Sequence, residues 1–261
     1  MNTSDTLFTS AGPIAYFTIN RPGAGNAMTW AMYDALADAC ERVDRDASLR
    51  AFVIRASGGV FCTGTDISQF TSFTSGQDGL TYERRLEAGV ARLEEVGVPT
   101  IAQVEGIAAG AGCVIALACD LRVCSTAARF GVPIARTLGN ALSVENCSRL
   151  VEHLGIARTK DLLITGRLMD AAEAAGSAIV TRLVPPADVA RVVDELIATI
   201  VRNAPLTLRS MKEALRRLSL RRRSLDREAI DDLIAACYAS EDFRAGVAAF
   251  LEKRPPVFKG R

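Results

Sequence analysis

GIAAGAGCVIALACD (residues 106–120) carries no charged side chain until it ends at Asp120. It begins with the spacing Gly-x-x-x-Gly-x-Gly, which is compatible with a turn that holds a phosphate group. A dinucleotide-binding turn, a membrane segment and a buried helix are therefore the three interpretations to separate. A membrane-spanning helix needs about 20 apolar residues, whereas this apolar run is shorter and lies between Glu105 and Asp120. We therefore predict a buried helix.

The position of the glycines argues against a dinucleotide site. A nucleotide-binding glycine turn normally follows the first strand of its domain and opens the first helix, but this one comes after residue 100, behind several expected strands. None of the tyrosines is followed four residues later by lysine, the pair that a short-chain dehydrogenase would need. Glycines at a helix start also leave its first N–H groups unpaired, and these can hold the negative charge that develops on a reacting carbonyl oxygen.

The composition is that of an ordinary soluble globular protein, with 49% hydrophobic and 23% charged residues among 261. The net charge of +1 gives no general attraction to nucleic acid or to an anionic membrane, so neither is expected as a partner. The seven cysteines form no Cys-x-x-Cys pair and are typical of reduced core thiols. The single histidine, His153, argues against an ordinary zinc site or a histidine-based triad. The start, MNTSDTLFTS, lacks the features of an export signal, so we expect a cytoplasmic protein.

Hydrophobic patterning predicts an α/β core followed by helices. Thr29 is placed to cap the first helix, and Ser143 is placed to cap a later helix that runs to about residue 154. The expected strands lie at 7–20 (as a hairpin), 51–58, 99–106 and 120–125. The other expected elements are a Ser/Thr/Gly-rich loop at 71–79, helices at about 81–96, 157–164 and 170–176, and only helical patterns from Pro185 onward.

Further segments, in order along the chain, carry a resemblance to a known family. They are RPGAGNAM (21–28), FCTGTDI (61–67), ACDLRVCS (118–125), ARFGVPIA (128–135) and SEDFRAGVAAFLEKRPPVFKG (240–260). Together with GIAAGAGC (106–113), they make the chain similar to the enoyl-CoA hydratase/isomerase (crotonase) family from about residue 7 to the C-terminus.

The resemblance implies a fold, an assembly and a ligand. It implies a crotonase-like spiral of ββα units over residues 1–200 and a helical C-terminal trimerisation region over residues 201–261. The chain would then form a homotrimer or a dimer of trimers. The ligand would be an acyl-CoA thioester. Coenzyme A is in that case the carrier part of the substrate, and neither a separate cofactor nor a metal is expected.

The resemblance also places the thioester oxygen against two backbone amides, those of Thr65 in GTD and Ala111 in GAG. Each such donor contributes about 3–4 kcal/mol of transition-state stabilisation. Because the main chain makes these bonds, the identity of the side chains at the two positions neither supports nor weakens the assignment. The neighbouring positions that the resemblance assigns to substrate binding are Ala24, Ala27, Cys62, Gly64, Asp66, Ile67 and Gly110.

Two positions depart from the family's pattern. A hydratase of this family uses two glutamates around one water, and the resemblance places them at Val114 and Ile134, which have no titratable proton. General acid–base groups contribute about 10²–10⁴-fold each, so an ordinary two-glutamate hydratase is not expected. Glu145, near the start of the next helix, is the candidate base that could move an allylic proton instead. The alternative is that Glu145 is only a favourable acid in a first helical turn.

Other polar side chains are interpreted mainly as structural. Asp66 most simply caps a helix that begins near Ile67. Glu83 and Arg84 are assigned to a solvated helix face, although they could line the acyl pocket. His153 is interpreted as a partner for helix-end carbonyl groups.

Two cysteines, two lysines and a cluster of arginines each have both a structural and a functional interpretation. Cys62 and Cys113 flank the inferred site but have no imidazole nearby in sequence, so they are assigned to packing. Lys253 and Lys259 match a region that in the family can reach a neighbouring subunit's nucleotide. An arginine cluster is assigned to a solvated face or a trimer rim, with coenzyme A phosphates as the alternative partner. Its members are Arg216, Arg217, Arg221, Arg222 and Arg223.

The sequence leaves three functions open. The first is an acyl-CoA enzyme that works through a thioester enolate, most simply a double-bond isomerase with Glu145 as its base. The second is a hydratase or lyase that uses acids not identified above. The third is a non-catalytic acyl-CoA binder or assembly partner.

Overall fold

The structure is a computed structural model that describes residues 4–177, 179–222 and 230–261. Of the predicted arginine cluster, Arg223 lies outside the described residues. None of the described helices is long and apolar enough to span a lipid bilayer.

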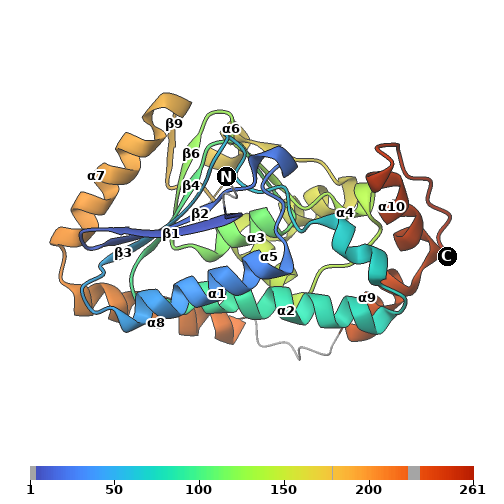
Figure 1. The fold of residues 1–261 in the computed structure, drawn as a ribbon, viewed down its shortest axis with the longest axis horizontal. Helices are drawn as coiled ribbons and strands as arrows, with labels where there is room; N and C mark the ends of the chain where they lie inside the picture. Colours follow the sequence, from blue (N-terminus) through green and yellow to red (C-terminus); the bar gives the residue numbers. More distant parts are fainter. Residues whose placement is uncertain (1–3, 178, 223–229) are drawn as a thin grey trace.

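A mostly parallel sheet forms the centre of the molecule (Figure 1). Its strands are β1 (Thr6–Ala11), β2 (Ile14–Ile19), β3 (Ala51–Ala56), β4 (Thr100–Val104), β6 (Leu121–Ser125) and β9 (Arg182–Val184). Over the described residues they are ordered β1-β2-β3-β4-β6-β9, with β1 and β2 as the predicted antiparallel hairpin and the later neighbours parallel. Parallel neighbours need crossover connections, which explains the alternation of strands and helices.

A smaller sheet is formed by β5 (Ile107–Ala109), β7 (Arg129–Gly131) and β8 (Met169–Asp170). The sequence did not predict these strands or β9. Each contains only two or three residues, which is too few to show the alternation of apolar and polar side chains that marks a strand. They form because neighbouring segments offer them backbone partners.

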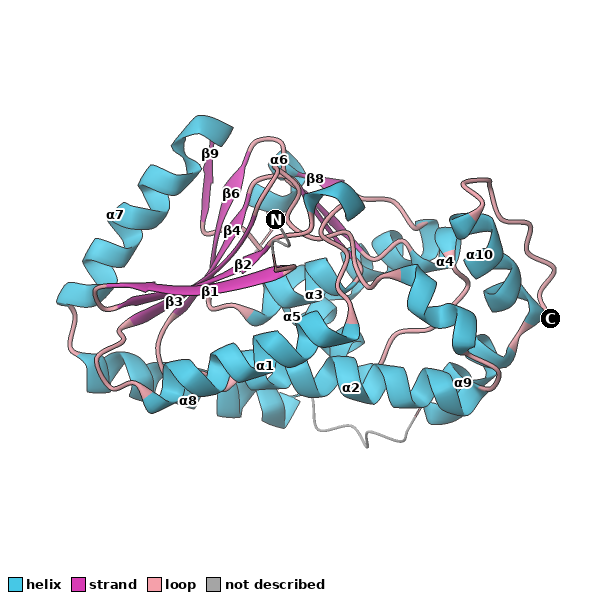
Figure 2. Cartoon of the chain, in the orientation of Figure 1, coloured by secondary structure: helices cyan, strands magenta, loops and turns pink. Residues whose placement is uncertain are grey.

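The helices surround the larger sheet and extend beyond it (Figure 2). They are α1 (Trp30–Arg45), α2 (Gly76–Glu94), α3 (Ala111–Ala118), α4 (Ile134–Thr137), α5 (Val144–Thr165), α6 (Ala171–Ala175), α7 (Val189–Arg202), α8 (Pro205–Arg222), α9 (Asp231–Ala239) and α10 (Glu241–Leu251). Short 3-10 helices are η1 (Pro22–Ala24), η2 (Ile67–Ser72) and η3 (Pro186–Asp188). The predicted caps are present, because Thr29 accepts from the Met32 amide and Ser143 accepts from the Asn146 amide. A break at Gly155 divides α5, close to the predicted gap between two helices.

The predicted loop at 71–79 is wrong in its second half, because α2 already begins at Gly76. Ser75 caps this helix, with Asp78 closing a capping box. Gly76 and Gly79 lie inside the helix because α9 crosses it closely. A Cβ on Gly79 would lie 2.1 Å from the Tyr238 ring, and one on Gly76 would lie 2.4 Å from the Ala235 carbonyl oxygen. The two glycines suggested a loop from the sequence alone, but in the structure they are needed for the close packing of α2 against α9.

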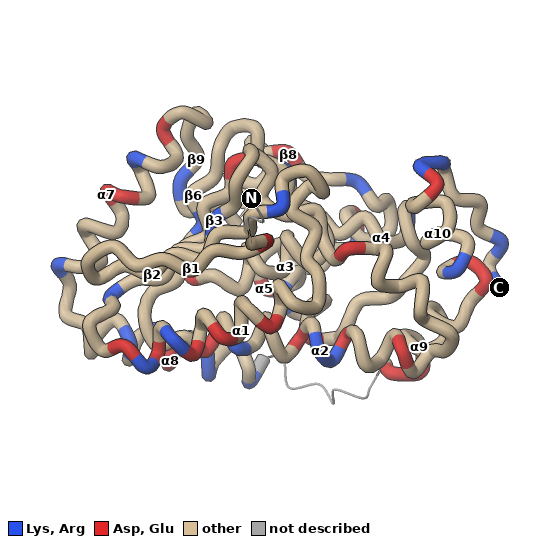
Figure 3. Tube along the Cα trace, viewed as in Figure 1, with Lys and Arg blue, Asp and Glu red and all other residues tan. Residues whose placement is uncertain are grey.

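Within the apolar stretch at 106–120, the predicted buried helix covers Ala111–Ala118 (α3), whereas Ile107–Ala109 form the short strand β5. Every residue of α3 is buried, and its glycines permit close backbone contact. A Cβ on Gly106 would lie 2.1 Å from the Gly59 carbonyl oxygen, and one on Gly112 would lie 2.2 Å from the Cys62 carbonyl oxygen. Charged residues gather instead on outer helices such as α8 (Figure 3). The glycine spacing thus reflects packing of α3 against the 59–62 segment.

A buried arginine supports the carboxyl end of α3. Arg122 on β6 is 5% exposed, and its guanidinium donates to the carbonyl oxygens of Ala116, Leu117, Cys119 and Ile179. The last carbonyl groups of a helix have no partner within the helix and carry its partial negative charge. Arg122 satisfies them, so this short helix is stabilised at the end opposite its glycine-rich start.

A second buried arginine joins two helices of the core. Arg149 on α5 is 1% exposed. Its guanidinium makes a bidentate pair with Glu87 on α2, both distances being 2.7 Å, and a further pair with Glu94 at 2.7 Å. Removing one partner of such a group leaves the other charges buried without compensation.

Replacing Arg149 with methionine should lower the free energy of unfolding by about 3–5 kcal/mol, because two glutamates lose their buried partner. Urea denaturation measures the change. The matched control is Arg191→Met, at an exposed ion pair with Asp188 and Glu195, which should leave the free energy of unfolding almost unchanged. Equal changes in the free energy of unfolding for the two substitutions would contradict the conclusion that the buried ion pairs of Arg149 stabilise the fold.

Candidate active site

A cavity of about 330 Å³ opens between η2, α2, the start of α3, α4 and α10. Its volume lies within the usual range for small-molecule sites. Most positions that the resemblance assigned to the site line it, whereas Cys62 is fully buried and does not. Those that do are Ala24, Ala27, Gly64, Thr65, Asp66, Ile67, Gly110 and Ala111. Phe250 of α10 also lines it, so residues on both sides of position 200 contribute.

Two glycine-containing segments meet at one edge of this cavity. A Cβ on Gly64 would lie 3.7 Å from the Ala111 nitrogen, and one on Gly110 would lie 3.5 Å from the Gly64 Cα atom. Both glycines have positive φ, +115° at Gly64 and +53° at Gly110, a region that favours glycine. The segments are held by backbone pairing, Met28 with Thr65 and Cys62 with Ala108.

The backbone N–H groups of Thr65 and Ala111 are available at this edge. Neither of them donates a hydrogen bond to another residue in the described part of the chain. By contrast, the Asp66 N–H donates to the Met28 carbonyl and the Gly110 N–H donates to the Gly131 carbonyl. Two unpaired donors beside one cavity, one of them at a helix start, form a binding site for a negatively charged oxygen.

The side chain of Thr65 fixes its own backbone. Its hydroxyl hydrogen-bonds to the Tyr33 hydroxyl at 2.7 Å and to the Tyr82 hydroxyl at 2.8 Å. Burial raises the pKa of both phenols above the ordinary value, so they remain neutral at physiological pH. The threonine is therefore anchored to α1 and α2, and its amide is held at the cavity edge.

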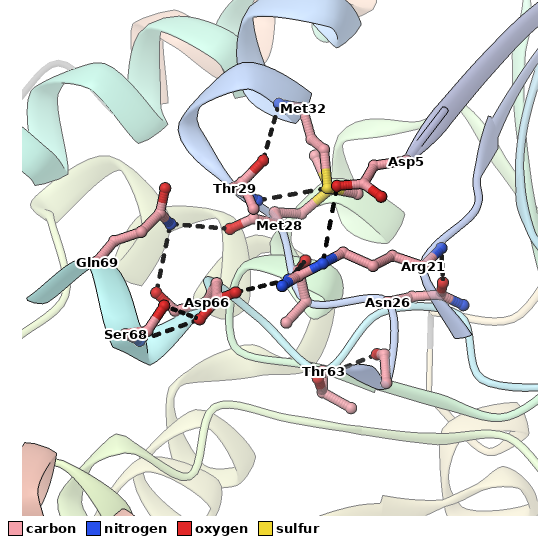
Figure 4. Close-up of polar contacts among 12 residues, drawn as sticks. Asp5, Arg21, Asn26, Met28, Thr29, Met32, Thr63, Asp66, Ser68 and Gln69 are labelled. Atoms are coloured by element: carbon pink, nitrogen blue, oxygen red, sulfur yellow. Dashed lines mark hydrogen bonds and ion pairs between the residues drawn. The ribbon is translucent and has the colours of Figure 1, made fainter. Parts of the chain in front are cut away.

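Asp66 has the structural role predicted for it (Figure 4). It caps η2 by accepting from the Ser68 amide at 3.0 Å and pairs with Arg21 at 2.6 Å. Burial by itself would raise the pKa of Asp66, but hydrogen bonds from Ser68 and Arg21 outweigh it and lower the pKa. The carboxylate is therefore held by these hydrogen bonds, and it stabilises the segment that follows Thr65.

Glu83 on α2 is the carboxyl group that the cavity contains in a buried position. It is 3% exposed. One oxygen accepts from the Tyr238 hydroxyl at 2.7 Å and the other accepts from the Ser143 amide at 3.0 Å. Burial raises the pKa of Glu83 to about 7; the two hydrogen bonds oppose the rise, and the charges of Glu87 and Glu145 add to it. A carboxyl group with this pKa can both accept and return a proton near neutral pH.

The solvated face predicted for Glu83 is therefore wrong, and that for Arg84 is confirmed. Arg84 is exposed and pairs with Asp231 at 2.7 Å. Glu83 lies within the repeating set of α2 positions that face the core, between Gly79 and Leu86. That spacing was readable in the sequence. What the sequence did not show was that Tyr238, 155 residues away, supplies its partner.

Comparisons with known proteins show what this chain resembles. Residues 9–261 match the family model described as enoyl-CoA hydratase/isomerase. The probable enoyl-CoA hydratase echA8 of Mycobacterium tuberculosis (strain CDC 1551 / Oshkosh) is 34% identical over 250 residues, 95% of each chain.

The chain belongs to the enoyl-CoA hydratase/isomerase family. The 2,3-dehydroadipyl-CoA hydratase of Escherichia coli (strain K12) is 30% identical over 269 residues, covering 99% of this chain and 100% of the relative. A structure of methylmalonyl-CoA decarboxylase with 2-nitronate-propionyl-CoA has a TM-score of 0.90 at 25% identity, covering 99% of each chain. An enoyl-CoA hydratase/carnithine racemase from Magnetospirillum magneticum has a TM-score of 0.80 at 29% identity, covering 100% of this chain and 97% of that one. These likenesses confirm the predicted crotonase-like fold.

The two apolar replacements lie where the family resemblance placed acids. Val114 on α3 and Ile134 on α4 both line the cavity. Glu145 does not line it; this residue lines a neighbouring cavity of about 340 Å³. For this member of the enoyl-CoA hydratase/isomerase family, the structure brings Thr65 and Ala111 together with Glu83 rather than with Glu145.

The remaining candidates lie away from the cavity lining. Burial raises the pKa of the Cys62 and Cys113 thiols to about 12, in agreement with their packing role. Arg216 and Arg217 pair with Glu213 on α8. Neither they nor Arg221, Lys253, Lys259 and His153 line the site cavity.

The raised pKa of Glu83 predicts a pH-dependent stability. The folded chain holds this proton with a pKa of about 7, against a reference value of 4.5, so the associated stabilisation is complete below pH 4.5 and is lost as the pH rises to about 7. Glu83→Gln removes this titration. Its unfolding free energy relative to the unmodified protein should increase between about pH 5 and pH 8 by on the order of 3 kcal/mol. Denaturation experiments in which the difference in unfolding free energy does not change with pH would contradict the raised pKa of Glu83.

Proposed function

We propose that the protein is an acyl-CoA enzyme that forms a thioester enolate, and that it moves the double bond of an enoyl-CoA. The observation that carries this proposal is the convergence on one cavity of two unpaired amides, at Thr65 and Ala111, with one buried carboxyl group, at Glu83. The two amide N–H groups would donate hydrogen bonds to the thioester oxygen, and the carboxyl group would remove and return a substrate proton. The relatives named as enoyl-CoA hydratases support the class of substrate.

The proposed reaction uses Glu83 as both base and acid. Its carboxylate removes a proton from C2 of a 3-enoyl thioester, and the C–H electron pair moves toward the carbonyl oxygen. The resulting dienolate oxygen is stabilised by the Thr65 and Ala111 N–H groups. Glu83 then returns a proton to C4, which leaves the double bond between C2 and C3. Tyr238 and Ser143 orient the carboxyl group through their hydrogen bonds. Glu83 thus takes the role that the sequence assigned to Glu145.

Ordinary hydration is less well supported by this site. It requires one group to activate a water and another to protonate the carbanion, and the family's two positions for them are occupied by Val114 and Ile134. A single carboxyl group suffices for a proton shift between two carbons of one substrate.

Decarboxylation is a second candidate, supported by a specific observation. Structures of methylmalonyl-CoA decarboxylase have TM-scores of 0.90 and 0.89 with this chain. Loss of CO₂ from a malonyl-type thioester leaves its C–C electron pair as the same enolate, and no base is needed. The apolar side chains of Val114 and Ile134 would favour departure of a carboxylate by desolvating it, and protonated Glu83 would supply the proton to C2.

The assembly and the remaining contacts stay predictions. We propose that the chain acts as a homotrimer or a dimer of trimers, formed through residues 201–261. Coenzyme A would approach along the loops of Ala24, Ala27 and Asp66, which line the cavity. A direct contact from Cys62 is not supported, because that side chain is fully buried.

Removing the Ala111 N–H tests the amide site. Ala111 is the first residue of α3, a position at which proline preserves a helix but removes the donor. Ala111→Pro should lower turnover of a 3-enoyl-CoA about 10²–10³-fold, while circular dichroism shows an intact fold. Ala111→Gly keeps the N–H and separates loss of the donor from loss of the side chain. A folded proline variant with full turnover would exclude this amide from the reaction.

Replacing Glu83 tests the proton transfer. Glu83→Gln should lower isomerisation about 10²–10⁴-fold and abolish exchange of the C2 proton with D₂O, whereas Glu95→Gln, exposed at the end of α2, should change neither. A protein that binds the thioester but never exchanges this proton would be a non-catalytic binder.

The pH dependence of kcat/KM separates the two candidate reactions. Isomerisation needs the Glu83 carboxylate, so its rate should rise as the pH passes about 7, the pKa of that group. Decarboxylation uses the protonated form, so release of CO₂ from methylmalonyl-CoA should instead decline above that pH.

A further inference from the structure

Glu83 separates the site cavity from a second cavity. This neighbouring cavity, of about 340 Å³, lies between α2, the start of α5 and α9. Among the residues that the structure describes, Glu83 is the one that lines both cavities. Glu83 thus borders both cavities. One side holds the amides of Thr65 and Ala111, and the other side holds no part of the proposed oxyanion site.

The second cavity contains more carboxyl groups than the first, in which Asp66 and Glu83 are the acidic lining residues. Its lining includes Glu87, Glu145 and Asp231 in addition to Glu83, with Arg84 as its cation. Arg84 pairs with Asp231, and Glu87 pairs with Arg149. Glu145 is partly exposed, whereas Glu83 is 3% exposed. Carboxyl groups therefore lead from the buried end of this cavity toward solvent.

The two sides of Glu83 differ in how water could reach it. The substrate-side cavity is lined near its reacting end by Leu86, Val114 and Ile134, apolar side chains that an acyl chain would cover. The second cavity has apolar lining residues too, among them Leu80 and Ile234, but it also contains several charged groups and is large enough to hold several water molecules. The charge of Glu145 also contributes to the raised pKa of Glu83, so the two carboxyl groups interact.

We propose that the second cavity is a proton-exchange route, through which Glu83 exchanges its proton with solvent by way of Glu145 and cavity water while the substrate occupies the first cavity. The proton on a Glu83 oxygen leaves to water or to the Glu145 carboxylate, and a solvent proton replaces it, so there is no net chemical change. This inference rests on the enolate chemistry proposed above. Its consequence is that the proton delivered to the product comes largely from solvent and not from the substrate.

The test measures the origin of that proton. A 3-enoyl-CoA is converted in D₂O, and mass spectrometry with NMR gives the deuterium content at C4 of the 2-enoyl product. For the unmodified protein most product molecules should carry deuterium at C4. In Glu145→Gln, and in Ala88→Leu, which adds bulk to the lining of the second cavity, deuterium per product should fall severalfold, because direct return of the substrate proton then competes. Glu152→Gln, on the same helix but outside this cavity, is the matched control and should match the unmodified protein.

Two outcomes overturn the exchange route. One is product without C4 deuterium from the unmodified protein, and the other is unchanged deuterium content in both Glu145→Gln and Ala88→Leu. Formation of the 2-enoyl product is followed in parallel. If no product forms, the enolate chemistry itself is contradicted, and the exchange route with it. If product forms without C4 deuterium, only the exchange route fails.

Discussion

The close approach of two backbone segments, at Gly64 and at Gly110, is the constraint on which the rest of this structure depends. Both residues have positive φ, a backbone conformation that favours glycine and strains any other residue at these positions. Their approach leaves the amides of Thr65 and Ala111 side by side without partners in the described chain. Unpaired buried donors are costly, so the surrounding structure must hold them in place. Pairing of Cys62 with Ala108, the Asp66–Arg21 pair and the Thr65 hydroxyl contacts all do so.

The carboxyl group at the site has its properties because of where α2 and α9 cross. Gly79 allows the Tyr238 ring to lie against α2, and the Tyr238 hydroxyl then reaches Glu83. Burial at this crossing raises the pKa of Glu83. The C-terminal helices, which the sequence assigned to assembly, therefore also form part of the site within one chain, since Tyr238 and Phe250 both take part.

In this protein, the main-chain features that mark the family are distinct from the side chains available for acid–base chemistry. The features shared with the enoyl-CoA hydratase/isomerase family are those of the main chain, and they require only particular turns and a helix start. The acid–base groups are side chains, and these can change without disturbing the backbone. Val114 and Ile134 lie in the cavity wall and Glu83 lies on another helix. In the proposed function, the same oxyanion site would be combined with a different source of protons.

The sequence by itself determined the family, the main strands, a buried helix within 106–120 and the caps at Thr29, Asp66 and Ser143. These depend on local patterns, namely apolar runs, glycine spacing and side chains that bond to nearby backbone. Only the tertiary structure decided that 76–79 is helical, that short strands such as β5 and β7 exist, and that Glu83 rather than Glu145 lines the cavity. Each of these depends on contacts between residues far apart in the chain. The Tyr238 hydroxyl that bonds to the Glu83 carboxyl group comes from α9, and no pattern within α2 contains that information.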